Sequence, residues 1–471
     1  MKRNHRLLKS LAFLLATAGV LSSQATRAAT HHMDGVWRSQ GYGYVLEVKE
    51  GKPQLYHYTS RSCAKASEDV NAALENDLTR IDRTEADRLS FHVSDGITRY
   101  DFERLPNLPD NCPTAPSLDP EQNFEAFWQA YNEHYAFFDL HNVDWQSVYE
   151  KYRPSVTKST SEDDLYAIFV EMLTLLDDGH VMLEAGDRMF RSGKRGTLHA
   201  LAAKELPDSD TFSIYESEPL ARITRTIDSH YLKGSRQGSA TAKPVSWGRI
   251  GGDIGYIGID GMYGFAAEGA PSADRQRVVD AVMQEALKDL HDVKGIIVDA
   301  RWNPGGYDQV ALAIAEYLTS ANVLAFTKKA RLESGFTPKQ RIYVSSRGDR
   351  AFSGPVVYLQ GSDTFSAAEI FTLAMQALPN VTTIGERTGG GLSDVLEFKL
   401  PNGWGVTMSN EVYIASDGKS YEGVGIPPDM ALAPADNDTL ESFLRRGVDQ
   451  AVAVLEEKIE KSKGKTPDLP K

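Results

Sequence analysis

The chain has 471 residues, of which 51 are Lys or Arg and 65 are Asp or Glu, so its formal net charge is −14. An acidic chain of this kind is a poor partner for nucleic acid or anionic lipid, and we expect it to bind neither. The length exceeds that of a single hydrophobic core and predicts about two or three domains.

Residues 1–28 have the pattern of a signal peptide. Lys and Arg residues up to Lys9 precede the apolar stretch 11–21, and small residues at 25–29 suit cleavage. The apolar stretch is too short to span a bilayer, and no other segment is apolar enough to do so. We therefore expect a periplasmic or secreted protein without stable membrane insertion. Removing the five basic residues of this segment from the net charge of −14 leaves −19.

The N-terminal quarter is predicted to be a small disulfide-linked β module. Residues 31–105 contain short alternating apolar runs between turn residues, which is typical of an antiparallel sheet. The two cysteines, Cys63 and Cys112, are candidates for one disulfide in an oxidising compartment. Residues 106–120 are rich in proline and are predicted to be a linker. No His/Cys cluster has metal-ligand spacing, so we expect no metal and no cofactor.

Residues 121–185 are predicted to form a helical domain. Aromatic and aliphatic residues recur at helical spacing in two segments and are expected to be core: Phe124, Phe127, Trp128, Tyr131, Tyr135, Leu165, Ile168, Phe169, Met172 and Leu176. The second segment leads to Gly179 and His180, and the glycine is a typical helix stop. Residues 186–245 are polar and weakly periodic, and they are predicted to be an irregular insertion.

Residues 246–435 alternate between strand-like and helix-like patterns, which predicts an α/β core with a parallel or mixed sheet. The predicted strands and helices in chain order are 249–260, 272–290, 295–300, 309–318, 355–359, 366–378 and 381–385. A hairpin is expected to turn at Pro401–Asn402–Gly403. Residues 436–471 are predicted to be a C-terminal helix and tail.

Ser366 lies where an apolar strand pattern changes into a helix pattern. Unpaired backbone N–H groups and a positive field at a helix N-terminus would stabilise an alkoxide or a tetrahedral oxyanion. Serine is also a preferred helix N-cap, and Glu369 stands at capping-box spacing, so a purely structural role is the alternative.

A serine nucleophile needs a base, a group that orients the base, and an oxyanion hole. His180 is the candidate base, and Glu422 in a Gly/Pro-rich loop is the candidate orienting acid. Gly305 and Gly306 follow a predicted strand, where bare backbone N–H groups could contact a carbonyl oxygen. Each residue also has a structural alternative, as a buried histidine, a solvated acid or an ordinary turn. No GxSxG elbow or phosphate-binding loop is present.

Five motifs in order resemble the S41 peptidases, specifically the tricorn-like branch: LLDDGH, DARWNPGG, TFSAAE, IGERTGGG and EGVGIPPD. The resemblance implies a crotonase/ClpP-like spiral core, with Ser366 as nucleophile, His180 as base and Glu422 as the orienting acid. It also implies an oxyanion hole formed by the N–H of Ala367 with that of Gly305 or Gly306.

Two features of this sequence depart from the family pattern. The tricorn-like branch has a serine before the histidine, where this chain has Gly179. Glu422 would then reach His180 directly, through water, or through another hydroxyl such as that of Ser393. Residues 186–245 also lack the motifs of a PDZ module.

The sequence therefore predicts an exported serine peptidase that acts on a peptide or protein and passes through an acyl-enzyme. One alternative is a catalytically silent protein of the same fold that binds peptides or small ligands. Another is a CoA-dependent crotonase relative, which fits poorly with export and with a serine at a helix start. The sequence does not indicate an oligomeric state.

Overall fold

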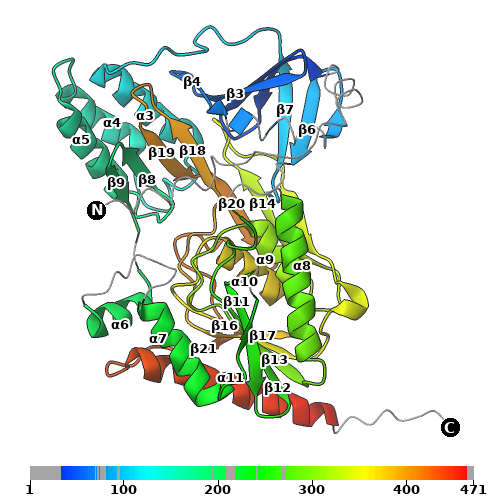
Figure 1. The fold of residues 1–471 in the computed structure, drawn as a ribbon. Coiled ribbons are helices and arrows are strands. Elements are labelled where there is room, and N and C mark those ends of the chain that lie inside the picture. The colour runs from blue at the N-terminus through cyan, green and yellow to red at the C-terminus, as the bar shows by residue number, and fades with distance from the viewer. Residues whose placement is uncertain are drawn as a thin grey trace.

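The computed structural model describes residues 33–68, 70–71, 74, 81–92, 96–193, 195–207, 218–239, 242–267 and 272–463. These residues form an upper and a lower lobe (Figure 1). The upper lobe contains the N-terminal β module and the helical segment, and the lower lobe contains the α/β core. The predicted signal peptide lies outside the described residues.

The N-terminal module is one antiparallel sheet with strand order β4-β3-β2-β1-β7-β6-β5. Its strands are β1 (Gly35–Ser39), β2 (Tyr44–Lys49), β3 (Lys52–Tyr58), β4 (Cys63–Lys65), β5 (Ile81–Thr84), β6 (Arg88–His92) and β7 (Arg99–Leu105). Trp37, Leu46 and Phe91 are fully buried in its core. Cys63 and Cys112 form the predicted disulfide, which ties the end of this sheet to the Pro-rich linker.

The helical segment contains α3 (Pro120–His134), α4 (Trp145–Tyr152) and α5 (Glu162–Thr174). Side chains of Asp119, Asp144 and Ser161 accept hydrogen bonds from the first backbone N–H groups of these helices. The predicted aromatic stripe is core: of its ten members only Trp128 and Ile168 are partly exposed, and the other eight are buried.

A four-stranded sheet with order β18-β19-β8-β9 completes the upper lobe. Its strands are β8 (Met182–Ala185), β9 (Arg188–Arg191), β18 (Val395–Lys399) and β19 (Gly405–Ser409). The hairpin predicted at Pro401–Asn402–Gly403 is present, since Lys399 pairs with Gly405. It leaves the predicted core segment 246–435, however, and pairs with β8 in the upper lobe. The reason is its apolar face, where Leu396, Phe398, Val406 and Met408 are buried among the aromatic helices.

The lower lobe is built on a seven-stranded sheet with order β10-β11-β12-β13-β16-β17-β21, parallel from β12 to β21. Its strands are β10 (Gln237–Gly238), β11 (Val245–Ile250), β12 (Ile254–Ile259), β13 (Gly295–Asp299), β16 (Val356–Gln360), β17 (Val381–Gly385) and β21 (Met430–Ala431). The stretch predicted as one strand at 249–260 is therefore a hairpin, because Gly251 and Gly252 let the chain reverse between β11 and β12.

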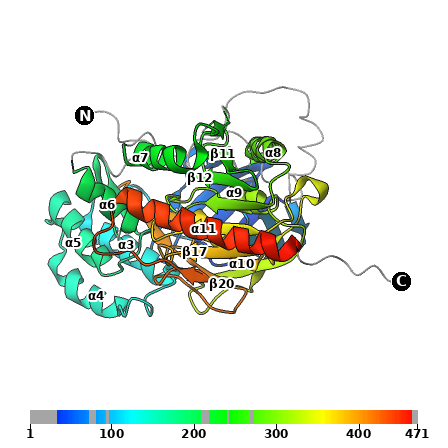
Figure 2. The ribbon, with the colours of Figure 1, turned by 90° about the horizontal axis from the view of Figure 1, so that it is seen from below.

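Helices cover both faces of this sheet. On one face α8 (Ser272–Asp289), α9 (Asp308–Ala315) and α10 (Ala367–Ala377) pack against Ile296 and Val298. On the other face α11 (Leu440–Lys463) packs against Ile297, and Figure 2 shows it lying across the underside of the sheet. Neighbouring residues of one strand are thus buried on opposite faces, as expected of a parallel sheet. The predicted α/β fold is confirmed.

The predicted irregular insertion 186–245 contains regular structure among its described residues. Besides β9 and β10 it holds α6 (Thr197–Glu205) and α7 (Glu218–Ile227). Leu198 and Ile223 are buried against Phe443 and Leu444 of α11. The helical pattern is weak in the sequence because these short helices bury few residues each and depend on a distant helix for their apolar contacts.

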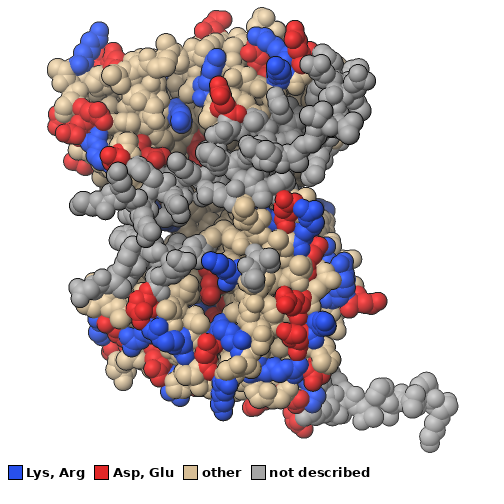
Figure 3. Space-filling view, in the orientation of Figure 1, with Lys and Arg blue, Asp and Glu red and all other residues tan. Residues whose placement is uncertain are grey.

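A three-stranded antiparallel sheet connects the two lobes, with order β15-β14-β20. Its strands are β14 (Val323–Ala330), β15 (Gln340–Val344) and β20 (Glu411–Ala415). No helix among the described residues is long and apolar enough to cross a membrane. On the face shown in Figure 3, Lys and Arg side chains are interspersed with Asp and Glu side chains.

Candidate active site

Ser366 occupies a strained position at the start of α10. Its backbone has φ 57° and ψ −128°, a conformation that residues other than glycine rarely adopt. Such strain costs about 1–3 kcal/mol and persists only where the surroundings enforce it. Here the Ser366 N–H donates to the Gly391 carbonyl oxygen at 3.1 Å and to Glu369 Oε2 at 3.3 Å. The second bond is one half of the predicted capping box.

His180 lies directly beside this serine. Its Nε2 is 3.1 Å from Ser366 Oγ, although the two residues are 186 positions apart in the sequence. His180 comes from the turn before β8 in the upper lobe, and Ser366 comes from the lower lobe. The contact therefore joins the two lobes. Burial lowers the pKa of His180 from 6.5 to about 4, so the imidazole is neutral near pH 7 and can accept a proton.

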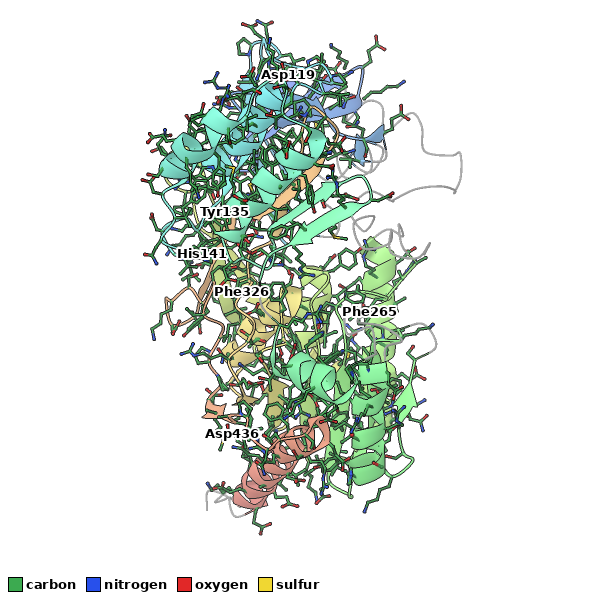
Figure 4. The ribbon with its side chains drawn as sticks, turned by 90° about the vertical axis from the view of Figure 1, so that its left-hand side faces the viewer. Asp119, Tyr135, His141, Phe265, Phe326 and Asp436 are labelled. Carbon is green, nitrogen blue, oxygen red and sulfur yellow. A yellow bond between two sulfur atoms is a disulfide. The ribbon has the colours of Figure 1, made fainter. Side chains whose placement is uncertain are left out.

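The turn that carries His180 is held by Asp178. One carboxylate oxygen of Asp178 accepts from the His180 backbone N–H at 2.9 Å and from the Ser409 hydroxyl at 3.2 Å. Its other oxygen accepts from the Tyr135 hydroxyl at 3.0 Å. Figure 4 shows Tyr135 and His141 at the end of the helical segment that faces the core. The negative charge of Asp178 raises the pKa of His180, against the larger effect of burial.

The glycine before His180 is explained by its neighbours. A Cβ atom at Gly179 would lie 2.7 Å from the ring of Phe365, and a Cβ at Gly193 would lie 2.7 Å from the Gly179 Cα. The Phe365 ring also contacts the His180 ring, with centroids 4.8 Å apart. A serine at position 179 would therefore collide with the residue that precedes Ser366.

Two backbone N–H groups near Ser366 could bind an oxyanion. Among the described residues, neither the Gly306 N–H nor the Ala367 N–H has a hydrogen-bond partner within the protein. The Gly305 N–H, in contrast, already donates to Asn303 Oδ1 at 2.9 Å. A residue without a side chain is nonetheless required at Gly305, since a Cβ there would lie 2.6 Å from the Ser366 Cβ and 2.9 Å from the Ala367 nitrogen.

The glycine-rich segment Thr388–Gly391 is fastened to α10 by Glu369. The buried carboxylate accepts from the Gly390 N–H at 2.8 Å, the Gly391 N–H at 2.7 Å and the Thr388 hydroxyl at 2.5 Å. Burial raises the pKa of Glu369 to about 7, and these hydrogen bonds oppose that shift. The same carboxylate binds the Ser366 N–H, so it supports the strained serine.

Glu422 is buried close to this cluster but makes no hydrogen bond to His180. Its Oε2 accepts from the backbone N–H groups of Leu392 at 3.0 Å and Ser393 at 2.9 Å. Burial raises the pKa of Glu422 well above 4.5, and the charges of Asp178 and Glu369 raise it further. Among the described residues, His180 Nδ1 is buried and has no hydrogen-bond partner.

The Ser393 hydroxyl does not link Glu422 to His180. It donates to the Asp394 carbonyl oxygen at 2.9 Å and accepts from the Glu411 N–H at 3.0 Å. Within the described ranges, no group of three or more His, Cys, Asp or Glu side chains is arranged to hold a metal ion.

Sequence reasoning missed Asp178 and Phe365 as parts of the site. Both stand inside motifs that were recognised, beside His180 and Ser366 respectively. Their adjacency to the candidate catalytic residues was the available signal.

Two family models match parts of the chain. Residues 253–432 match the model described as Peptidase family S41, and residues 116–174 match the model described as Tricorn protease C1 domain.

The chain is similar to several curated proteins. It is 26% identical over 187 residues to a carboxy-terminal-processing protease of Bartonella bacilliformis, which covers 39% of this chain and 40% of that protein. It is 20% identical over 415 residues to Tricorn protease homolog 1 of Streptomyces coelicolor, which covers 75% of this chain and 36% of that protein. The chain thus spans well under two thirds of the length of these relatives.

Among solved structures, a crystal structure of a candidate peptidase from Parabacteroides merdae superposes with a TM-score of 0.55 at 25% identity, covering 72% of this chain and 97% of that chain. Mature CPAF superposes with a TM-score of 0.50 at 12% identity over 73% of this chain and 98% of that chain, a likeness of fold. With these similarities and the ordered motifs taken together, residues 253–432 form a peptidase domain of family S41, a family of serine-type peptidases.

Proposed function

We propose that this protein is an exported serine peptidase that hydrolyses peptide bonds through an acyl-enzyme on Ser366. The observation that carries the proposal is the 3.1 Å approach of His180 Nε2 to Ser366 Oγ at a strained helix start. A serine that served only as a helix cap would need neither a neutral imidazole beside its hydroxyl nor a positive φ.

In the first half of the reaction, Ser366 Oγ attacks the carbonyl carbon of the scissile peptide bond. His180 Nε2 takes the hydroxyl proton as the new C–O bond forms. The N–H groups of Gly306 and Ala367 are proposed to bind the resulting oxyanion, each contributing about 3–4 kcal/mol. The protonated His180 then gives its proton to the leaving amine, and the C–N bond breaks to leave the acyl-enzyme.

In the second half, a water molecule attacks the acyl carbon and passes a proton to His180. The tetrahedral species collapses, the bond to Ser366 Oγ breaks, and Oγ recovers its proton from the imidazolium. Glu422 is proposed to orient His180 through a water molecule that bridges its carboxylate and Nδ1. A bridge is invoked because the carboxylate bonds to the backbone N–H groups of Leu392 and Ser393 and makes no direct bond to Nδ1.

The test is labelling of the purified protein with a fluorophosphonate, with the modified peptide located by mass spectrometry. We expect a single label on Ser366, none in Ser366→Ala, and strongly slowed labelling in His180→Gln. Labelling at unchanged rate in His180→Gln would remove His180 as the base. The absence of labelling in the wild-type protein would favour the catalytically silent binder.

Export is proposed from the signal-peptide pattern of residues 1–28 and is supported by the disulfide between Cys63 and Cys112. Expression of the full chain in a Gram-negative host, followed by fractionation and N-terminal sequencing, tests it. We expect a periplasmic or secreted product that begins near residue 29. A cytoplasmic product with the N-terminal segment intact would contradict export.

A further inference from the structure

His199 of α6 contacts two loops that carry the proposed catalytic groups. Its Nδ1–H donates to a carboxylate oxygen of Asp363, which lies in the nucleophile loop (residues 361–366). Its ring stacks on the indole of Trp302 in the oxyanion loop (residues 300–306), with centroids 4.2 Å apart and an interplanar angle of 14°. The first loop ends at the proposed nucleophile, and the second ends at one of the proposed oxyanion donors.

The Asp363 carboxylate is the buried end of this connection, with its side chain 3% exposed. Besides the imidazole, it accepts from the backbone N–H groups of Gly196 at 3.1 Å and Leu198 at 2.7 Å, at the start of α6. Gly196 is the N-cap of α6 and has no side chain, so Asp363 supplies the cap from a distant part of the chain. These backbone donors would keep the carboxylate bonded in a variant that lacks the imidazole.

Trp302 is held by ring packing. It is buried in an apolar cluster with side chains of α6 and α11, and its indole N–H has no hydrogen-bond partner within the described part of the chain. The stack with His199 therefore restrains the ring directly. The next residue, Asn303, shapes the oxyanion loop, because its side chain accepts from the Gly305 N–H at 2.9 Å and its carbonyl oxygen accepts from the Phe365 N–H at 3.0 Å.

We propose that His199 is a positioning residue for the serine reaction, which holds the nucleophile loop and the oxyanion loop at their working separation. The proposal rests on the proposed function, since Ser366 and the N–H groups of Gly306 and Ala367 are the groups that it would align. Groups that converge on one reacting carbonyl must be placed to within about 0.5 Å. A residue that contacts both loops fixes their separation.

A second histidine allows this role to be separated from simple anchoring. His230 lies in the same stretch of the chain, between β9 and β10, and its Nε2 is 3.0 Å from Glu441 Oε1 of α11. Its ring also contacts Tyr231. Neither partner belongs to the nucleophile loop or the oxyanion loop. If His199 only anchored this stretch to the rest of the protein, loss of either histidine would have the same effect on the active site.

The test is fluorophosphonate labelling of Ser366 at a series of probe concentrations, which separates the maximal labelling rate from the half-saturating concentration. His199→Leu removes both the hydrogen bond and the ring. We expect it to lower the maximal rate about 100-fold and to leave the half-saturating concentration unchanged, because the groups are displaced but the probe still binds. His199→Asn keeps an N–H donor and His199→Phe keeps the ring, so each should recover part of the rate.

His230→Leu is the matched control and should label at the wild-type rate. Thermal unfolding verifies that each variant is folded, and the Asn and Phe variants carry the test if His199→Leu does not fold. Hydrogen exchange followed by mass spectrometry adds a readout that does not depend on the chemistry of Ser366. Exchange should be faster in peptides that cover both loops in His199→Leu, and in neither loop in His230→Leu.

An unchanged maximal rate in folded His199→Leu, an equal loss in His230→Leu, or no recovery by either conservative variant would overturn the positioning role. So would faster exchange in α6 that reaches neither loop. These results are distinct from failure of the proposed function. Labelling of the wild-type protein at a rate that no His199 variant changes would overturn the positioning role alone. Absence of wild-type labelling, with faster exchange of both loops in His199→Leu, would overturn the serine chemistry alone.

Discussion

The strained backbone conformation of Ser366 lowers the stability of the fold at the position of the proposed nucleophile. At φ 57° an L-residue with a Cβ is strained, whereas glycine is not. We therefore predict that Ser366→Gly unfolds at a higher temperature than Ser366→Ala, with a difference in unfolding free energy of about 1 kcal/mol. Both variants lack the hydroxyl and should be inactive, so the comparison isolates the backbone. Thermal unfolding measures it, and equal stability of the two variants would show that the position is unstrained.

Asp178 and Glu422 are the two buried acids that could serve His180. Asp178 raises the pKa of the imidazole, while Glu422 is not among its causes. His180 must lose its proton to act as a base, so the labelling rate should rise with increasing pH around the His180 pKa of about 4. We predict that Asp178→Asn moves this rise to lower pH, because removing the negative charge makes the imidazolium less favourable. Glu422→Gln should leave its position unchanged while lowering the maximal rate.

The measurement is the rate of fluorophosphonate labelling of Ser366 across the acidic range in both variants. An unchanged profile in Asp178→Asn would limit Asp178 to holding the turn at His180. A profile shifted only by Glu422→Gln would make Glu422 the charge that His180 senses.

At the scale of elements, the loop between β13 and α9 must pass close to the start of α10. Gly305 has φ 102°, and a Cβ there would lie 2.6 Å from the Ser366 Cβ. We predict that Gly305→Ala lowers kcat/KM about 10²–10³-fold, since it would displace the serine from its oxyanion donors. Gly335→Ala is the control, because Gly335 also has a positive φ, of 86°, but open space around it.

The control should lose about 1 kcal/mol of stability and keep its activity. Kinetics with a chromogenic peptide and thermal unfolding of both variants separate the two effects. Equal activity losses in Gly305→Ala and Gly335→Ala would mean that backbone strain, not the close approach to Ser366, is responsible.

Elements with local patterns could be predicted from the sequence, and those that depend on distant partners could not. The strand before Ser366 and helix α10 are close to their predicted bounds, because the apolar run and the helical spacing are both local. The β18–β19 hairpin was also predicted, but its pairing with β8 was not, since register between distant strands leaves no local signal.

The same limit applies to the site. The order of the motifs predicted that Ser366 and His180 lie in one site, and their side chains are in contact. The collision of a side chain at Gly179 with Phe365 could not be predicted, because it depends on the packing of two lobes. The lack of a direct bond from Glu422 to His180 Nδ1 was unpredictable for the same reason, because Glu422 binds backbone N–H groups that only the folded chain presents.

At the scale of the whole molecule, a buried ion pair joins the β module to the core. Lys328 of β14 is 2.7 Å from Glu411 of β20, and both side chains are 1% exposed. The other oxygen of Glu411 accepts from the Tyr42 hydroxyl at 2.6 Å and from the Thr98 hydroxyl at 3.3 Å, both in the β module. The Glu411 N–H donates to Ser393, whose own N–H donates to Glu422. The pair thus connects the module to the surroundings of the active site.

We predict that Lys328→Met destabilises the protein by about 3–5 kcal/mol, because it leaves the Glu411 carboxylate buried without its cation. Adding Glu411→Gln should recover part of that loss, since the amide is uncharged yet still offers an oxygen to Tyr42. Urea unfolding of the single and double variants measures both steps. If the double variant is no more stable than Lys328→Met, the pair is not what holds the interface. If the urea transition splits in Lys328→Met, the β module unfolds separately, and labelling of Ser366 between the two transitions then shows whether the active site needs the module.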